Sequence, residues 1–392
     1  MNSTKQIPIR ASYMRGGTSK GVFFNQKDLP EKAQRPGAER DMIMLRVIGS
    51  PDPYGKQIDG MGNGTSSTSK VVIIGPSDRE DCDVDYLFGA VAIDAPVVDW
   101  SGNCGNLSSA VGPYAIQEGL VDAGSDGLKT VRIWQSNLGK KIIAHVPVKN
   151  GQVVELGDFE LDGVTFPAAE VQLEFLDPGA DEDSDGGTMF PTGNFVDTLD
   201  IPGVGNIEAT LMNAGNPIIF IHAKSLGFSG IELQEDVNNN SDLLKKLETI
   251  RAYATVAMGL AASPSEATEQ RPHTPKLSFV ANAGSYIASS GKAVSEQEID
   301  MTARIMSMGK LHHAMTGTGA IAIAVASAIP GTIVNQVLGG KSQAKVKFGH
   351  PSGTLGVGAE ANNTSGAWVI SKALMSRSAR RLMTGEVWVP EA

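Results

Sequence analysis

Cysteine is nearly absent from this chain, whose 392 residues contain only two, Cys82 and Cys104. Two cysteines provide no disulfide framework, which indicates a reducing compartment, so we expect a cytoplasmic protein. Basic residues are also scarce: 33 Lys and Arg stand against 43 Asp and Glu, for a net charge of −10. No basic stripe with interleaved aromatic residues is present, which argues against nucleic acid as a partner. Any acidic ligand must therefore be bound by local positive groups.

Long apolar segments are missing as well. The N-terminal residues 1–8 have no apolar core of the kind that a signal peptide needs. The most apolar stretch, Ala314–Ile329, is rich in Ala and Gly and is too short to span a bilayer. We therefore predict a buried helix at this stretch and no membrane partner.

An acidic segment lies near the middle of the chain. Residues Asp177–Asn194 are rich in Asp and Gly and lack periodic apolar positions, which is typical of an exposed loop or linker. Asp181, Asp183 and Asp185 alternate as in calcium loops, but the glycine and the distal glutamate are misplaced for an EF-hand. No other cluster has metal-ligand spacing, so we expect no metal.

A chain of 392 residues is long enough for two domains, which we place at residues 1–184 and 185–392. The two halves resemble each other. Met14-Arg-Gly-Gly-Thr-Ser-Lys-Gly-Val-Phe-Phe24 in the first half and Met212-Asn-Ala-Gly-Asn-Pro-Ile-Ile-Phe-Ile221 in the second share their Met, Gly and Phe positions. This correspondence predicts two copies of one unit.

Each half also contains a glycine-flanked turn that opens an apolar helix. In the first half the turn is Gly102–Asn106, and in the second it is Met315–Ala320. If the two copies face each other about a twofold axis, the two helix N-termini meet at one cleft. Helix N-termini bind anions, so this cleft would be an anion site.

The apolar patterns also predict several individual elements. We expect strands at Val71–Ile74, Val131–Trp134 and Ile142–Val148, helices at Leu243–Leu260 and Ser295–His312, and a final helix and strand within Ser376–Pro390.

Cys104 is the first candidate for catalysis. It stands among Gly102, Asn103, Gly105 and Asn106, which are poor core formers but suit a backbone that approaches a ligand closely. A thiol at a helix start lies beside unpaired backbone N–H groups, which stabilise its thiolate and can bind a substrate carboxylate. The alternative is that Cys104 is a small buried hydrophobic residue.

These motifs resemble a known family. The paired glycine turns and Gly215-Asn216-Pro217 resemble the diaminopimelate epimerase fold, an α+β fold with two pseudo-symmetric domains in which strands wrap around a central helix. The first-half motif at Met14–Phe24, together with Gly62–Lys70 and Ser101–Asn106, resembles the PrpF branch, the 2-methylaconitate cis–trans isomerases of propionate catabolism through the 2-methylcitrate cycle. The resemblance covers nearly the whole chain.

The chain departs from the epimerase pattern at one position. Two-base epimerases of this fold have a cysteine before each helix, whereas the position that matches the second cysteine is Thr316. A threonine hydroxyl is too weak an acid or base to replace a thiol at neutral pH. We therefore expect a one-sided proton shift rather than inversion by two thiols.

Lys70 is the better candidate for the base, and the resemblance points to the same residue. It lies where the polar run from Gly60 meets the β-forming run Val71–Ile74, so a rigid strand can aim its amine. An ordinary lysine is protonated at neutral pH, so a basic lysine must be desolvated or lie near another cation. The alternative is an exposed charge.

The resemblance also implies how the substrate is bound and turned over. A methylene proton beside an unsaturated carboxylate can be removed if helix N-termini stabilise the resulting dienolate, and rotation before reprotonation gives cis–trans or allylic isomerisation without a cofactor. Arg271 is a candidate bidentate clamp for a carboxylate. The other residues expected to bind carboxylates are Ser19, Asn106, Asn216, Gly317, Thr318 and Gly319.

Other titratable residues carry weaker signals. His312 and His313 have no companions at metal-ligand spacing, so we interpret them as helix-end residues, and His350 as part of a turn that could line the cleft. Cys82 has acidic neighbours, which should raise the pKa of its thiol and make it inert.

The sequence therefore predicts an isomerase that acts on a small unsaturated tricarboxylate, with 2-methylaconitate as the first candidate. Two alternatives remain: a tautomerase of an oxalomesaconate-like or methylitaconate-like acid, and a non-catalytic accessory protein that holds such an acid or a partner dehydratase. The oligomeric state also stays open, with a homo-oligomer among the alternatives.

Overall fold

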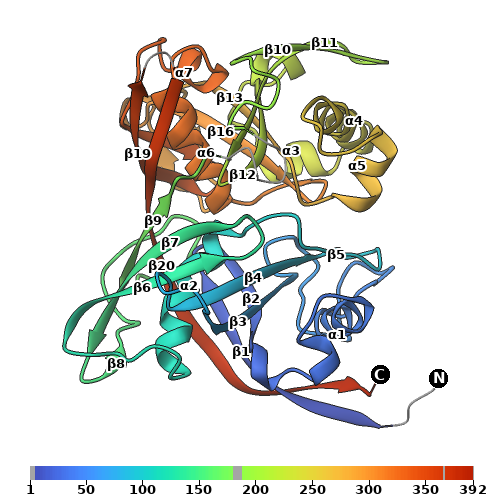
Figure 1. The fold of residues 1–392 in the computed structure, drawn as a ribbon. Helices are drawn as coiled ribbons and strands as arrows, with labels where there is room; N and C mark the ends of the chain where they lie inside the picture. The colour runs from blue at the N-terminus through green and yellow to red at the C-terminus, as the bar shows by residue number, and fades with distance from the viewer. Residues whose placement is uncertain (1–4, 180–187, 365–366, 392) are drawn as a thin grey trace. The chain divides into compact units, whose positions relative to one another are not determined.

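The computed structural model describes residues 5–179, 188–364 and 367–391. The chain divides into two compact units (Figure 1). Unit 1 comprises Met1–Glu160, Phe166–Leu173 and Arg377–Ala392, and unit 2 comprises Leu161–Thr165 and Glu174–Ser376. The predicted domain boundary at 184/185 and the three alternating aspartates of the acidic segment lie outside the described residues.

Unit 1 is built on one mixed sheet. Its strands follow the order β1 (Gln6–Gly16), β2 (Ser19–Asn25), β3 (Lys70–Pro76), β4 (Val84–Val91), β6 (Gly127–Gln135) and β7 (Lys140–Lys149). Successive pairs are antiparallel, parallel, antiparallel, parallel and antiparallel. The strands predicted at 71–74, 131–134 and 142–148 are confirmed within β3, β6 and β7. The remaining strands are β5 (Val98–Asp99), β8 (Gln152–Val153) and β9 (Glu170–Leu176), of which residues 174–176 belong to unit 2.

Two helices pack on opposite faces of this sheet. Helix α2 (Gly105–Gln117) is buried at every residue except Gln117, as expected for a helix that forms the centre of a core. Its Tyr114 contacts Phe23 of β2, with ring centroids 5.5 Å apart. On the other face, α1 (Ala38–Ile48) buries Ile43 and Met44 against Val71 and Ile73 of β3.

Unit 2 repeats this arrangement. Its strands follow the order β11 (Gly205–Ala214), β12 (Asn216–His222), β13 (Lys276–Asn282), β16 (Met301–Ser307), β18 (Lys345–His350) and β19 (Gly353–Thr364). The pairs are again antiparallel, parallel, antiparallel, parallel and antiparallel. The shorter strands are β10 (Asp197–Ile201), β14 (Tyr286–Ile287), β15 (Ala293–Val294) and β17 (Lys310–Leu311).

The helices of unit 2 follow the same scheme. Helix α6 (Gly317–Ala328) is buried at all twelve residues, which confirms the buried helix predicted within Ala314–Ile329. Helix α4 (Ser241–Ala257) confirms the helix predicted at 243–260, and it packs Leu247 and Ile250 against Leu277 and Phe279 of β13. The shorter helices are α3 (Gln234–Asn238), α5 (Pro264–Gln270) and α7 (Ile333–Val337).

Two predicted helices are wrong. The segment Ser295–His312 forms a short 3-10 turn, Glu296–Glu298, followed by β16 and β17. All seven residues of β16 are buried and the strand pairs on both sides, so its sequence lacks the alternation that distinguishes a strand from a helix. The predicted C-terminal helix is also absent, because β20 (Ala367–Pro390) is one continuous strand that pairs with β1 over Gln6–Gly16.

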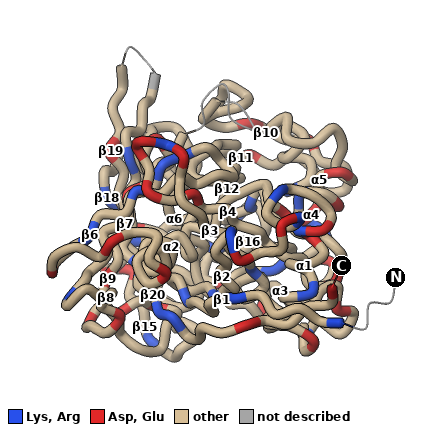
Figure 2. The backbone as a smooth tube through the Cα atoms, turned by 60° about the horizontal axis from the view of Figure 1, so that its bottom comes forward, with Lys and Arg blue, Asp and Glu red and all other residues tan. Residues whose placement is uncertain are grey.

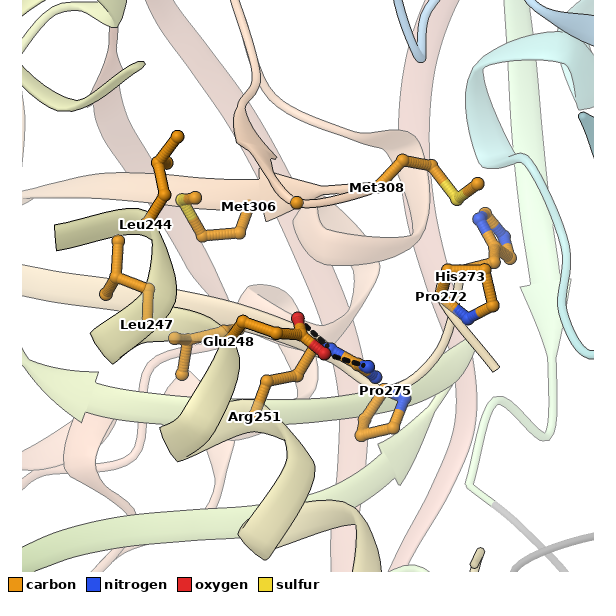
Figure 3. Close-up of a pocket in the computed structure, with 11 residues that line it drawn as sticks. Leu244, Leu247, Glu248, Arg251, Pro272, His273, Pro275, Met306 and Met308 are labelled. Carbon is orange, nitrogen blue, oxygen red and sulfur yellow. Dashed lines mark hydrogen bonds and ion pairs between the residues drawn. The ribbon is translucent and has the colours of Figure 1, made fainter. Parts of the chain in front are cut away.

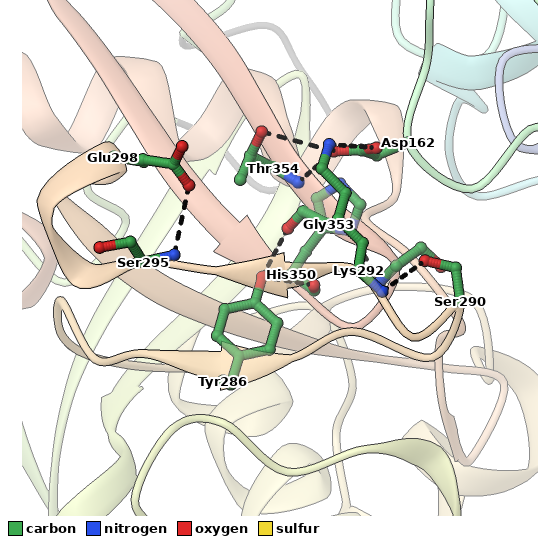
Figure 4. Close-up of polar contacts among 10 residues, drawn as sticks. Asp162, Tyr286, Ser290, Lys292, Ser295, Glu298, His350, Gly353 and Thr354 are labelled. Carbon is green, nitrogen blue, oxygen red and sulfur yellow. Dashed lines mark hydrogen bonds and ion pairs between the residues drawn. The ribbon is translucent and has the colours of Figure 1, made fainter.

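Residues Leu161–Thr165 are held in unit 2 by a single carboxylate (Figure 4). Asp162 binds Lys292 Nζ at 2.9 Å and accepts the backbone N–H of Thr354 at 2.7 Å. Gly353 has a φ of +142°, and a Cβ at this position would lie 2.2 Å from Asp162 Oδ2. Glycine is therefore required where β19 begins.

Figure 2 shows Lys and Arg dispersed among Asp and Glu along the described part of the chain. The helices of the described residues include none that is long and apolar enough to cross a membrane.

Candidate active site

The predicted site residues of unit 1 gather around the start of α2. The β1–β2 turn packs directly on this helix start: Gly17 has a φ of +50°, and a Cβ there would lie 2.5 Å from Asn106 Oδ1. Asn106 Nδ2 donates to Thr18 Oγ1 at 3.0 Å. Ser19 is the first residue of β2 and is buried. The glycine pair of the first-half motif therefore allows the turn to touch the helix that carries Cys104 and Asn106.

Cys104 is the residue that precedes α2 and is 7% exposed. Its backbone is extended, with φ −113° and ψ 94°, and its side chain makes no capping hydrogen bond. Its carbonyl accepts the hydroxyl of Tyr86 at 3.3 Å, and burial raises the pKa of Tyr86 well above its ordinary value. Tyr86 thus remains a neutral donor that fixes the backbone beside the thiol.

Lys70 is the first residue of β3 and is 5% exposed. Its Nζ lies 5.0 Å from the centre of the Phe88 ring, a cation–π contact. Ile74 pairs with Tyr86 and Val72 with Phe88, so alternate residues of β3 and β4 share the face that α2 covers. Lys70 therefore lies on the face of the sheet that is covered by α2, the helix that Cys104 precedes. Because Lys70 is buried, the alternative that it is an exposed charge is wrong.

Arg377 belongs to the same cluster, and sequence reasoning missed it. The side chain is fully buried, and Nε donates to Asn106 Oδ1 at 2.9 Å. Burial lowers the pKa of Arg377 to about 9, and the nearby Cys104 opposes that shift. The run Ser376–Arg381 looks like an exposed basic turn, but Arg377, Ser378 and Ala379 are buried while Arg380 is exposed. The sequence of this run has no alternation of apolar residues that signals this burial.

The predicted residues of unit 2 gather around the start of α6 in the same way. Gly215 has a φ of +71°, and a Cβ there would lie 3.2 Å from Ile321 of α6. Asn216, the first residue of β12, is buried. Thr316 caps the helix, with Oγ1 accepting the N–H of Gly319 at 3.1 Å. Gly317 and Thr318 form the buried first turn of α6.

The paired histidines lie at the entry to α6 rather than at the end of a helix, so that interpretation was wrong. His312 and His313 stack with ring centroids 4.6 Å apart. His312 Nδ1 accepts the N–H of Ala314 at 3.0 Å, and His350 Nδ1 accepts that of Ser352 at 3.2 Å. Burial lowers the pKa of His313.

Arg271 follows α5 and precedes Pro272, which lines a small pocket (Figure 3). The backbone carbonyl of Arg271 accepts a guanidinium N–H of Arg251 at 3.1 Å, and Arg251 also binds Glu248. His273 and Pro272 line the same pocket. The role of Arg271 as a clamp for a substrate carboxylate stays a prediction.

Cys82 is buried, and burial raises the pKa of its thiol, with Asp81 acting in the same direction. The prediction of a raised pKa is confirmed, with burial as the larger cause. Over the described ranges, no three His, Cys, Asp or Glu residues are grouped so as to hold a metal ion.

The sequence profile of the PrpF protein family matches residues 6–390. The chain belongs to the PrpF family. It is 61% identical to a protein of Cupriavidus necator named 2-methyl-aconitate isomerase, over 100% of this chain and 99% of that protein. A protein of Shewanella oneidensis with the same name is also 61% identical, over 98% of both chains.

Solved structures place this PrpF protein in its fold. A crystal structure of methylitaconate-delta-isomerase is 39% identical and superposes with a TM-score of 0.75, covering 99% of this chain and 97% of that one. A probable proline racemase from Agrobacterium radiobacter superposes with a TM-score of 0.55 at 12% identity, covering 97% of this chain and 92% of that one. The predicted diaminopimelate epimerase-like fold is confirmed.

Proposed function

We propose that this protein is an isomerase that shifts a proton within a small unsaturated tricarboxylate, with 2-methylaconitate as its substrate in propionate catabolism. The observation that carries the proposal is 61% identity over essentially the whole chain to two proteins named for this reaction. A methylitaconate-like substrate is less well supported, because the relative named for it is 39% identical.

Lys70 is the proposed base. The rigid start of β3 fixes the amine, and the Phe88 ring beneath it excludes water from one side. The amine would remove a methylene proton beside the unsaturated carboxylate, leaving a dienolate in which the former double bond has single-bond character. Rotation about this bond and return of the proton give the other isomer.

The helix starts are the proposed source of charge stabilisation. The first backbone N–H groups of a helix lack partners within the helix and carry partial positive charge, so they stabilise a developing dienolate. We propose that Cys104 and Asn106 contribute from α2, and Gly317 and Thr318 from α6, where the N–H of Gly319 already donates to Thr316 Oγ1. We propose that Ser19, Asn216 and Arg271 also bind carboxylates.

Incubation with candidate acids in heavy water tests the proposal. The purified protein is mixed separately with cis- and trans-2-methylaconitate, aconitate, itaconate and mesaconate derivatives, and isomer ratios and deuterium uptake are followed by NMR. We expect interconversion of the 2-methylaconitates, with deuterium entering the methyl or methylene position. Binding without isomerisation or exchange would favour the accessory-protein alternative instead, and turnover confined to another acid would replace the substrate.

The proposal includes a cytoplasmic location. Cys82 and Cys104 are both free thiols, which supports a reducing compartment.

A further inference from the structure

Gln57 of unit 1 is a buried residue with a strained backbone. It is 1% exposed, and its φ of +55° lies in the left-handed region, where residues other than glycine are uncommon. The carboxylate of Asp52 stabilises this conformation by accepting its backbone N–H and those of Tyr54 and Lys56. A strained residue persists only where the surrounding structure enforces it, so the strain at Gln57 points to a role for its side chain.

The side chain of Gln57 binds the loop of residues 60–69, which leads into β3. Its Oε1 accepts the backbone N–H of Gly64 and the hydroxyl of Ser69, both at 2.8 Å. Its Nε2 donates to Ser50 Oγ at 2.9 Å. One buried amide therefore holds the loop at its middle and at its last residue, and both of these hydrogen bonds use the oxygen Oε1.

Ser69 is fixed from several sides, directly before Lys70. Its hydroxyl lies between Gln57 Oε1 and the carbonyl oxygen of Thr65, which is 2.7 Å away. Its backbone N–H donates to the same Thr65 oxygen at 3.1 Å, and its carbonyl accepts the N–H of Val91 at 3.0 Å. Because Ser69 and Lys70 are consecutive, the backbone at Ser69 determines the point from which the Lys70 side chain extends.

The position of the Lys70 amine depends on that point. Its Nζ lies 5.0 Å from the centre of the Phe88 ring. Strand β2 limits the side chain as well, since a Cβ on Gly21 would lie 3.3 Å from Lys70 Cβ. Misplacing a reacting group by about 1 Å can slow a reaction by about 100-fold. A loop that shifts the start of β3 would therefore affect the rate without touching the amine.

We propose that Gln57 is a positioning residue for Lys70: its amide anchors the loop of residues 60–69 and thereby keeps the Lys70 amine over the Phe88 ring. The proposal rests on the proposed function, because it takes Lys70 as the base of that reaction. Gln57 acts through the backbone of Ser69 rather than by contact with the amine, and Oε1 is the atom that the loop requires.

Two substitutions at Gln57 test this assignment. Gln57→Gly removes the amide and adopts the left-handed backbone without strain, whereas Gln57→Glu keeps an oxygen that can accept from Gly64 and Ser69. With 2-methylaconitate as substrate, we expect Gln57→Gly to lower kcat by about 10- to 100-fold and to leave KM nearly unchanged. Gln57→Glu should restore most of the rate. The matched control Gln34→Gly removes another amide of unit 1, which donates to Leu29 O at 2.9 Å, and should keep the wild-type kcat.

A second measurement reports the position of Lys70 without any substrate. Protons beside an amine that lies over an aromatic ring are shifted upfield by the ring current. In protein with 13C-labelled lysine, the Lys70 signal is the one that Lys70→Arg removes. We expect this signal to move towards the ordinary lysine position in Gln57→Gly and to stay in place in Gln57→Glu and Gln34→Gly.

An unmoved Lys70 signal in a folded Gln57→Gly protein would overturn the proposal, whether or not kcat falls, and so would Gln57→Glu that is as impaired as Gln57→Gly. A wild type that does not turn over 2-methylaconitate would count against the proposed function alone, and the Lys70 signal would then decide the role of Gln57. If Gln57→Gly does not fold, Ser69→Ala removes one of the two hydrogen bonds to Oε1. The Lys70 signal should move in that variant, and a signal that stays in place contradicts the proposal.

Discussion

At the scale of single residues, unit 1 contains two candidates for proton transfer, the amine of Lys70 and the thiol of Cys104. Lys70 rests on an aromatic ring at the start of β3, and Cys104 opens α2 with its carbonyl held by Tyr86. Each side chain can be replaced by a smaller one while the backbone of β3 or α2 is kept, so substitutions can distinguish the two roles.

Lys70→Ala should reduce kcat by about 10²–10⁴-fold, the loss typical of a missing acid–base group. Cys104→Ser should reduce turnover less and leave substrate binding largely intact, because serine keeps the helix opening. The matched control is Lys20→Ala on the neighbouring strand β2. Lys20 also makes a cation–π contact, because its Nζ lies 5.5 Å from the centre of the Tyr13 ring. Steady-state rates and solvent deuterium exchange measure all three. If Cys104→Ser loses exchange while Lys70→Ala keeps it, the thiolate is the base.

His313 should make the stability of the protein depend on pH. Burial lowers the pKa of His313 in the folded state below its ordinary value of 6.5. As the pH falls below about 6.5, the unfolded chain takes up a proton that the folded chain does not, so the free energy of unfolding decreases down to the folded-state pKa. In His313→Gln this part of the decrease should vanish, as measured by urea unfolding between pH 7 and pH 5. The control is His145→Gln, in β7 of unit 1. Identical pH dependence in the wild type and His313→Gln would refute the prediction.

The site residues show how far sequence alone reaches. Lys70, Cys104 and Asn106 could be predicted as site residues from the sequence, because each lies next to a glycine-rich motif. The burial of Arg377 could not be predicted, because it depends on pairing between strands that are remote in sequence: β20, which contains Arg377, pairs with β1, more than 350 residues away. A basic residue looks exposed until its neighbours in the sheet are known.

At the scale of elements, the two central helices start differently. Thr316 caps α6 through a hydrogen bond from Gly319, whereas the Cys104 side chain provides no such cap for α2. A cap that pairs one orphan N–H group stabilises its helix. The α6 start therefore has a stabilising side-chain cap that Cys104 does not supply at α2.

Thr316→Ala should lower the free energy of unfolding by about 1 kcal/mol, because the Gly319 N–H loses its acceptor. Thr316→Ser keeps the hydroxyl and should lose less than half of that amount. Chemical denaturation of the purified variants measures the difference. Equal stability of the alanine variant and the wild type would show that the cap contributes nothing.

Helices and strands whose apolar residues recur at a clear helical or strand spacing were predicted well, and those without such a spacing were not. The helix at α4 and the strands β3, β6 and β7 follow amphipathic or β-branched patterns. Strand β16 has no such pattern because it is central in its sheet and buried on both faces. Its Ala, Arg and Met residues are good helix formers, so the pairing with β13 and β18, rather than local preference, determines its structure.

At the scale of the whole molecule, the internal repeat is the feature that the sequence revealed most clearly. Both units have the same succession of strand pairings and one fully covered helix. The repeat is not symmetric in chemistry: where unit 1 has Cys104 and Phe88, unit 2 has Thr316 and Ile305. Duplication places equivalent side chains at the same positions, and divergence at these positions gives unit 1 both an amine over an aromatic ring, Lys70, and a thiol at a helix start, Cys104.

This division of roles predicts that catalysis does not depend on a metal ion. The charge that develops on the dienolate is assigned to backbone N–H groups at the helix starts, and the described residues contain no group of three His, Cys, Asp or Glu suited to a metal. Turnover of 2-methylaconitate, followed by NMR, should therefore be unchanged after exhaustive dialysis against EDTA. Adding back magnesium, manganese, zinc or calcium should have no effect. A protein that loses activity on chelation and regains it with one of these ions would show that a Lewis acid, rather than the helix starts, stabilises the intermediate.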